Sequence, residues 1–109
     1  MAITYKVLAQ SAPSATTNTD VYTVGSGKQA VVSTITICNR GASTATYRIA
    51  IRPDGATIAN QHYITYDANV PANDTISLTL GLTADAADVV TVYASNANLS
   101  FNLFGTEIA

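Results

Sequence analysis

The most constraining feature of this sequence is a two-residue alternation between polar and aliphatic side chains. In residues 75–80, Thr and Ser alternate with Ile and Leu, so that every aliphatic side chain would face one side of an extended strand. The same period recurs in residues 46–52 and 99–103. None of these segments has the i, i+3, i+4, i+7 spacing of an amphipathic helix. The chain is therefore predicted to be all-β.

The alternation in residues 46–52, which contain two arginines, predicts which side chains are buried. It places Tyr47, Ile49 and Ile51 in the core and leaves Arg48 and Arg52 outside. Side chains that alternate in this way occupy the two faces of a half-buried strand.

Two further segments carry predictions about local structure. In residues 31–38, Val31, Ile35 and Ile37 are expected on one face and Cys38 on the other, where it behaves as a small hydrophobe or meets a neighbouring subunit. The Ala-rich residues 82–88 are expected to hold one short helical turn.

Turn residues divide the chain into segments of strand length. Residues 25–27, 39–41 and 53–55 contain the Gly, Asn, Pro and Asp that tight turns use. About eight strands at this spacing are typical of a sandwich or small barrel. Residues 1–109 are therefore predicted to form a single domain of about eight antiparallel strands in a two-sheet sandwich, either a jelly roll or an immunoglobulin-like Greek key.

Composition excludes several kinds of protein. Hydrophobic residues make up 48% of the chain and charged residues 11%, the reverse of the balance in disordered chains. A net charge of −2 excludes a nucleic-acid partner bound by neutralising its phosphates. No run reaches the roughly 18 apolar residues of a membrane span, so no membrane partner is expected. The single cysteine, Cys38, excludes an intrachain disulfide and fits synthesis in a reducing compartment.

A search for reactive groups favours structural roles. His62 is the only histidine, so no pair of histidines can bind a metal, and it is expected to be a polar residue at a strand edge. Ser26 lies outside any Gly-x-Ser-x-Gly elbow. Asp85 and Asp88 lack the alternating carboxylates of a calcium loop. No catalytic, cofactor-binding or metal-binding residue is predicted, and the chain is not expected to be an enzyme.

A surface poor in charge and rich in Thr suits repeated contact with other proteins. The candidate assembly surface consists of Arg48, Arg52, Tyr63 and Tyr66, since both arginines face outward from their strand and Tyr is enriched at interfaces. Tyr63 and Tyr66 are three residues apart, so an ideal strand would place them on opposite sides. One would then lie in the core and the other would be exposed.

Six stretches carry a resemblance to a known family: residues 20–24, 31–41, 47–55, 63–64, 88–93 and 101–107. Together they resemble small virion structural proteins of tailed bacteriophages, including phages of cyanobacteria. The resemblance implies a capsid decoration (cement) subunit that stabilises the particle by protein–protein contacts. It further implies major capsid or tail proteins as partners, assembly as a homo-oligomer, and a place in the virion after synthesis in the host cytoplasm. It carries no catalytic residues.

A second interpretation of the same resemblance is a tail, baseplate or fibre accessory protein. Such a protein could bind a host receptor or glycan. This interpretation predicts an exposed aromatic cluster drawn from Tyr63, Tyr66 and Tyr93, beside Asn and Asp side chains.

Overall fold

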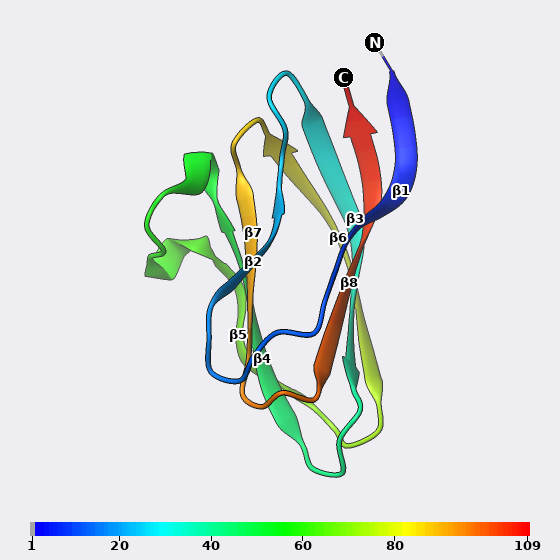
Figure 1. The fold of residues 1–109 in the computed structure, drawn as a ribbon, viewed down its shortest axis with the longest axis vertical. Helices are drawn as coiled ribbons and strands as arrows, with labels where there is room; N and C mark the ends of the chain where they lie inside the picture. The colour runs from blue at the N-terminus through cyan, green and yellow to red at the C-terminus, as the bar shows by residue number, and fades with distance from the viewer. Residues whose placement is uncertain (1) are drawn as a thin grey trace.

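The computed structural model describes residues 2–109, which form eight strands in two four-stranded antiparallel sheets (Figure 1). The predicted all-β, two-sheet sandwich is confirmed. The strands are β1 (Ile3–Ser11), β2 (Thr19–Thr23), β3 (Gln29–Asn39), β4 (Ala45–Arg52), β5 (Tyr63–Val70), β6 (Thr75–Asp85), β7 (Val89–Ala94) and β8 (Leu99–Ile108). Two short 3-10 turns, η1 (Pro53–Gly55) and η2 (Asn60–His62), lie between β4 and β5. Within this described part of the chain, no helix has the length and apolar character needed to cross a membrane.

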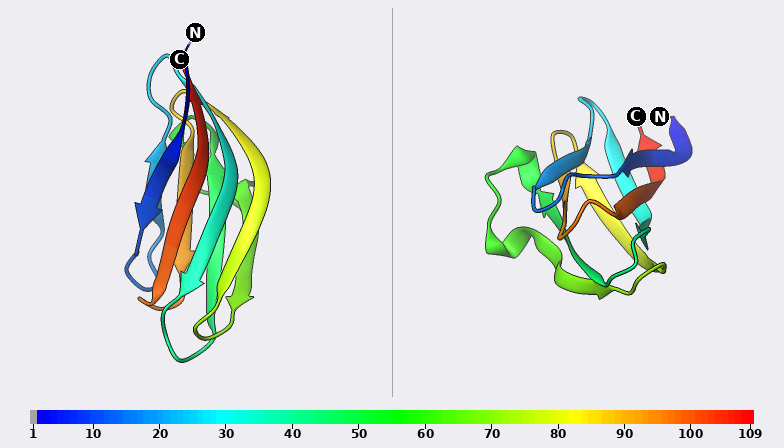
Figure 2. Two further views of the ribbon diagram at one scale, coloured as in Figure 1. Left: turned by 90° about the vertical axis from the view of Figure 1, so that its right-hand side faces the viewer. Right: turned by 60° about the horizontal axis from the view of Figure 1, so that its bottom comes forward.

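The strand order identifies the topology. One sheet has the order β1-β8-β3-β6 and the other β2-β7-β4-β5, and Figure 2 shows the two sheets face to face. The antiparallel pairs β1–β8, β2–β7, β3–β6 and β4–β5 are nested, as in one long hairpin that has been rolled up. This is a jelly roll, whereas an immunoglobulin-like sandwich pairs its first strand with its second. The choice left open by the sequence is thus decided in favour of the jelly roll.

The main core fills the space between the sheets with the aliphatic and aromatic side chains that the alternation predicts. Tyr47 and Ile49 of β4 are buried, and Tyr47 meets Phe101 of the opposite sheet edge-on, with the ring centroids 6.4 Å apart. Ile51 is half-buried and packs against a smaller cluster formed by Val24, Ala30 and Ala84. The aliphatic side chains at 76, 78 and 80 pack against the main core, as predicted.

One predicted face assignment is wrong because β3 contains an irregularity. The pairing of β3 with both of its neighbours shifts between Val32 and Thr34, so the alternation reverses at Ser33. Val32 is fully buried in the core, while Val31 is half-buried on the other face. Beyond the shift, Ile35 and Ile37 are buried and Cys38 points away from them, as expected.

The helical turn predicted for residues 82–88 is also wrong. β6 continues to Asp85, because Ala84 and Asp85 pair with Ala30 and Gln29 of β3. Ala84 is buried in the smaller core cluster. Pairing with a neighbouring strand therefore overrides the weak helical propensity of an Ala-rich segment.

Candidate functional site

Three of the four predicted surface residues meet on the outer face of the β2-β7-β4-β5 sheet. The guanidinium carbon of Arg48 lies 4.1 Å from the ring centroids of both Tyr66 and Tyr93. The Tyr63 ring meets Tyr66 edge-on, with centroids 4.8 Å apart. Arg48 Nε donates a hydrogen bond of 2.7 Å to the Asp67 carboxylate. We call these five residues the Arg48 cluster.

A bulge in β5 explains why the Arg48 cluster forms. Between Tyr47 and Ile49, β4 contributes only Arg48, whereas the facing part of β5 contributes both Tyr66 and Asp67. Asp67 adopts a left-handed backbone with φ of 53°, which short polar residues tolerate better than most. The bulge therefore brings an aromatic ring and a carboxylate to the same guanidinium.

The prediction that Tyr63 and Tyr66 lie on opposite sides of the strand is wrong. The register of β5 also shifts between its pairings with Ile49 and Ala50, and the two tyrosine rings are in contact. Tyr66 is 56% exposed and Tyr63 is half-buried. Tyr93, directly opposite Arg48 on β7, is also half-buried, so only Tyr66 is exposed among the three tyrosines named for a receptor-binding protein.

Electrostatics hold Arg48 in its charged form. The hydrogen bond to Asp67 is the largest cause of a raised pKa for the Arg48 guanidinium. No local sequence pattern pairs Asp67 with Arg48, since the two residues meet through the bulge. The Arg48 guanidinium lies between two rings and keeps part of its surface in water. Because the rings already hold it in place, contact with a partner would cost little side-chain entropy.

Arg52 lies apart from the Arg48 cluster and holds a loop in place. Its terminal nitrogens donate to Asp20 at 2.8 Å and to the carbonyl oxygens of Gly55 and Ala56, and its Nε donates to Thr91 at 3.0 Å. These bonds tie the end of β4 to β2, to β7 and to the connection that follows. An open hollow of about 320 Å³ lies beside them. Arg52 therefore has a structural role on the same outer face, outside the cluster.

Among residues 2–109, the exposed large hydrophobic side chains lie on only two strands. Ile3, Tyr5 and Val7 of β1 are 51%, 82% and 46% exposed, while Ile64 and Tyr66 belong to β5. β1 is an edge of one sheet and β5 an edge of the other. We call the exposed apolar side chains of β1 and those of β5 the two strips. Because β1 packs beside β2, and β2 is the edge of its sheet farthest from β5, the two strips lie on opposite edges of the molecule.

A third polar group joins β1, β2 and β8 where the sheets approach each other. Glu107 accepts hydrogen bonds from the Tyr22 hydroxyl at 2.6 Å and from Lys6 Nζ at 3.0 Å. The bond from Tyr22, followed by that from Lys6, lowers the pKa of Glu107 below its ordinary value. Burial and the nearby Glu107 carboxylate raise the pKa of Tyr22.

The lowered pKa of Glu107 predicts a pH-dependent contribution to stability. The stabilisation is fully present above the ordinary carboxyl pKa of 4.5 and is lost as the pH falls through the lower value of the folded state. Glu107→Gln should lower the free energy of unfolding by about 1–2 kcal/mol near neutral pH. Urea unfolding at about pH 7 and about pH 3 would check this, because the difference between the two proteins should shrink in acid. An equal difference at both pH values would contradict it.

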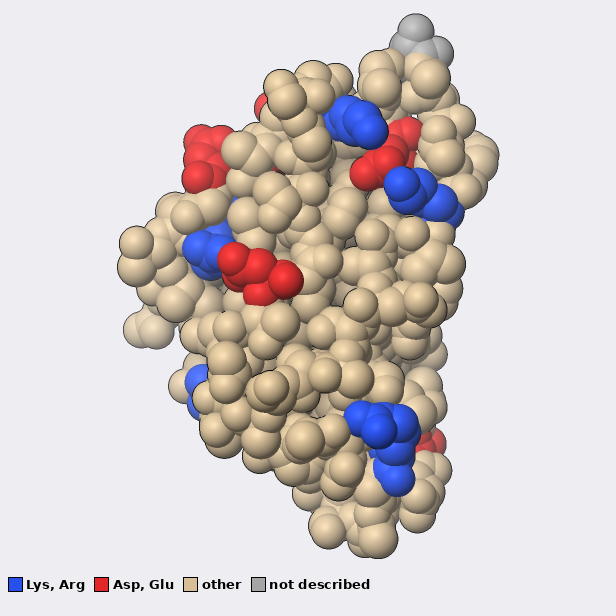
Figure 3. All heavy atoms as spheres, viewed as in Figure 1, with Lys and Arg blue, Asp and Glu red and all other residues tan. Residues whose placement is uncertain are grey.

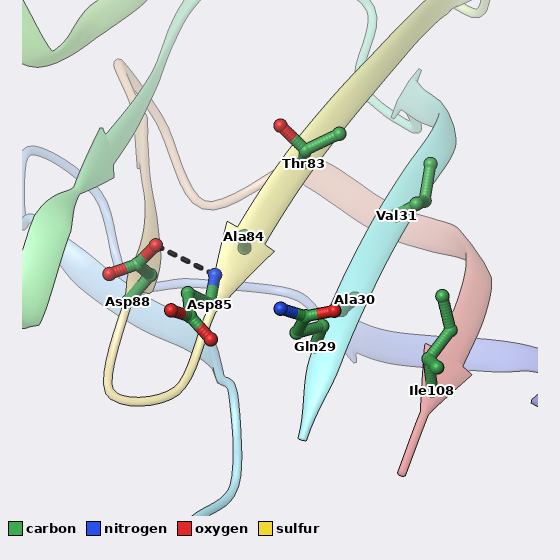
Figure 4. A pocket seen from close by; sticks show the side chains of 8 residues that line it. All are labelled: Gln29, Ala30, Val31, Thr83, Ala84, Asp85, Asp88 and Ile108. Carbon is green, nitrogen blue, oxygen red and sulfur yellow. Dashed lines mark hydrogen bonds between the residues drawn. The ribbon is translucent and has the colours of Figure 1, made fainter. Parts of the chain in front are cut away.

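The hollow drawn in Figure 4 lies where β3 begins and β6 ends, and it has a volume of about 360 Å³. Its carboxylates serve the local backbone: Asp88 accepts the N–H groups of Asp85 and Asp54, and Asp85 accepts that of Ala86. In the described part of the chain, no group of three or more His, Cys, Asp or Glu residues could hold a metal ion.

His62 lies at the end of η2 rather than within a strand. It is nearly buried, and its Nδ1 accepts the backbone N–H of Ala59 at 3.0 Å. The imidazole therefore fixes the entry into β5.

No protein-family model matches this sequence, and no curated protein does either. The family suggested by the six resembling stretches therefore stays a prediction.

Proposed function

We propose that this protein is a structural subunit of a tailed-bacteriophage particle, and specifically a capsid decoration subunit that stabilises the particle through protein–protein contacts. The observation that carries this proposal is the pair of exposed apolar strips on β1 and β5. Exposed apolar side chains grouped in this way mark interaction surfaces. Their positions on opposite edges allow one copy to contact two neighbours, such as a major capsid or tail protein and a further copy of itself.

The charge distribution supports the same proposal. Lys6, Arg48 and Arg52 each pair with a carboxylate of the same chain. On the face drawn in Figure 3, charged side chains form small separate groups on a mostly uncharged surface. Such a surface offers little electrostatic repulsion to many copies packed closely together.

The topology adds support by analogy. Jelly rolls of eight strands occur in viral capsid proteins and in lectins. Because one fold serves many functions, this analogy favours a particle component without deciding its role.

The direct test is to locate the chain in a cryo-electron microscopy map of intact phage particles. We expect density for this sandwich on the outside of the capsid, with Tyr66 or Tyr5 facing a neighbouring protein. Purified particles that lack the protein altogether would overturn the proposal. Density confined to the tail would replace decoration by the accessory role.

Arg48→Glu is expected to keep the fold and to weaken binding to particles. The change removes contacts worth about 1–2 kcal/mol in total, because the stacking and the ion pair are partly exposed. If the cluster lies at the interface, affinity for particles that lack the protein should fall at least about tenfold. Arg40→Glu provides a matched charge reversal, since the Arg40 side chain bonds to Ser100 of β8 and to Ala97 in the turn before β8, neither of which belongs to the Arg48 cluster. Equal binding by both variants would remove the Arg48 cluster from the interface.

A fibre or baseplate protein that binds a host receptor or glycan is the second candidate. The observation that favours it is the exposed Tyr66 ring beside Tyr63, Tyr93 and the Asp67 carboxylate. Binding to host cells or to a glycan array, abolished by Tyr66→Ala, would support this candidate. Absence of binding in both assays would exclude it.

A further inference from the structure

The outer edge of β1 has unpaired main-chain groups at known positions. Ala2 and Ala109 exchange both of their backbone hydrogen bonds, each 2.9 Å long. Because bonded and non-bonded pairs alternate in an antiparallel ladder, every second residue of β1 turns its N–H and C=O away from β8. These residues are Ile3, Tyr5 and Val7, and no other strand within residues 2–109 pairs with β1.

The same three residues expose apolar side chains on the outer face of the sheet. Between them, Thr4 and Lys6 belong to the other face, where Lys6 reaches Glu107. Proteins usually protect an edge strand with charges, proline, a bulge or a short length. The segment from Ile3 to Val7 has no proline, its one charge is paired, and the register shift of β1 comes only after Val7.

The other three edge strands are protected or polar. β2 is short and carries Asp20, and β5 is interrupted by two register shifts. β6 presents Thr75, Ser77 and Thr79 to solvent, with a further shift beside Gly81. The first five residues of β1 are therefore the edge best suited to pair with another strand.

We propose that β1 pairs antiparallel with β1 of a second copy, around a twofold axis that passes through Tyr5. The segment reads the same in both directions by residue type: a β-branched residue at each end, a polar residue next, and Tyr5 in the centre. In this register Ile3 lies opposite Val7 of the second copy, and Tyr5 lies opposite its own counterpart. Every outward N–H and C=O of the three residues then has a partner.

Other registers are worse for definite reasons. A slip of two residues leaves one outward residue of each copy without a partner, and a slip of one residue places outward groups opposite inward ones. The chosen register also brings Lys6 opposite Thr4 of the second copy, which avoids facing like charges. The result is an isologous contact that joins two four-stranded sheets into one continuous sheet.

The pairing names a second copy of the chain as one partner in the proposed function. Its geometry follows from the edge of β1, and only its role on a particle rests on the proposed function. The contact buries less than the roughly 800 Å² per partner of a standard interface, so we expect a dimer that dissociates on dilution. Close packing of copies on a particle would favour the paired state through a high local concentration.

Analytical ultracentrifugation of the purified full chain tests the pairing. We expect the wild-type mass to rise from one copy to two with concentration. Tyr5→Lys should stay at one copy throughout, because it places two ammonium groups opposite each other at the axis. The free chain should keep its fold, since the Tyr5 side chain is 82% exposed. Thr79→Lys, on the same sheet face at the β6 edge, should dimerise like the wild type. A wild type that stays at one copy, species larger than two copies, or loss of dimer in Thr79→Lys would each overturn the proposal.

Hydrogen exchange of single amides gives a second measurement with an internal control. The amides of Ile3, Tyr5 and Val7 should gain protection as concentration rises, whereas those of Thr4 and Lys6 should be protected at all concentrations by their bonds to β8. Equal behaviour of the two sets would contradict β1 pairing even if a dimer formed. Neither measurement involves phage particles, so this inference and the proposed function can fail independently.

Discussion

Ile49→Asp is expected to prevent folding. Ile49 is fully buried at the centre of β4, between Val92 of β7 and Thr65 of β5. Loss of the aliphatic side chain should cost about 2–5 kcal/mol, and the desolvation of an unpaired carboxylate adds several kcal/mol more. Together these terms are comparable to the 5–15 kcal/mol that separates a typical folded domain from its unfolded state. Far-ultraviolet circular dichroism and the dispersion of amide NMR signals would report the loss.

Two variants separate burial of charge from disturbance of the sheet. Ile49→Val removes only a methyl group, so it should fold and lose about 1 kcal/mol. Ile64→Asp places the same carboxylate on an exposed position of the neighbouring strand and should change the free energy of unfolding by less than about 0.5 kcal/mol. A folded Ile49→Asp protein with wild-type stability would mean that this side chain does not lie in the core.

The burial of Ile49 is the kind of property that the sequence predicts well. Alternation of polar and apolar residues is local, and it correctly assigned Tyr47 to the core and Arg48 to the outer face. The same pattern, cut by turn residues, predicted a two-sheet sandwich of about eight strands. Strand order depends on contacts between residues far apart in the chain, so the jelly roll had to be read from the structure.

The Arg48 cluster could be predicted only in part, because it depends on a bulge. Arg48, Tyr63 and Tyr66 were identified by residue type, but an ideal strand separates the two tyrosines. The shift between the pairings of Ile49 and Ala50 brings the two tyrosines to one face, and the shift between Tyr47 and Ile49 recruits Asp67. The shift at Ser33 has the same effect in β3, where it exchanges the positions expected for Val31 and Val32. Such shifts are set by the partner strand, and they reverse every face assignment that follows.

Register shifts also explain why Gly105 is needed in β8. Gly105 lies between β1 and β3, opposite Lys6 and Val32, next to the shift in β3. A Cβ atom at this position would collide with the carbonyl oxygen of Val31 and would lie 3.0 Å from Cδ1 of Leu8. The obstacle is backbone held by hydrogen bonds on both sides, so it cannot turn away as a flexible side chain could.

Gly105→Ala is therefore expected to lower the free energy of unfolding by about 3 kcal/mol, the upper part of the usual cost of overpacking. Gly25→Ala is the matched control, since the nearest atom to its added methyl group would be Cδ of Lys28 at an ordinary 3.5 Å. That variant should stay within about 0.5 kcal/mol of the wild type. Urea unfolding followed by circular dichroism measures both. Gly105 also pairs with Lys6 of β1, so Gly105→Ala should increase hydrogen exchange at Thr4 and Lys6 before global unfolding. Equal stability of the Gly105→Ala and Gly25→Ala variants would show that β3 and β8 can move apart at low cost.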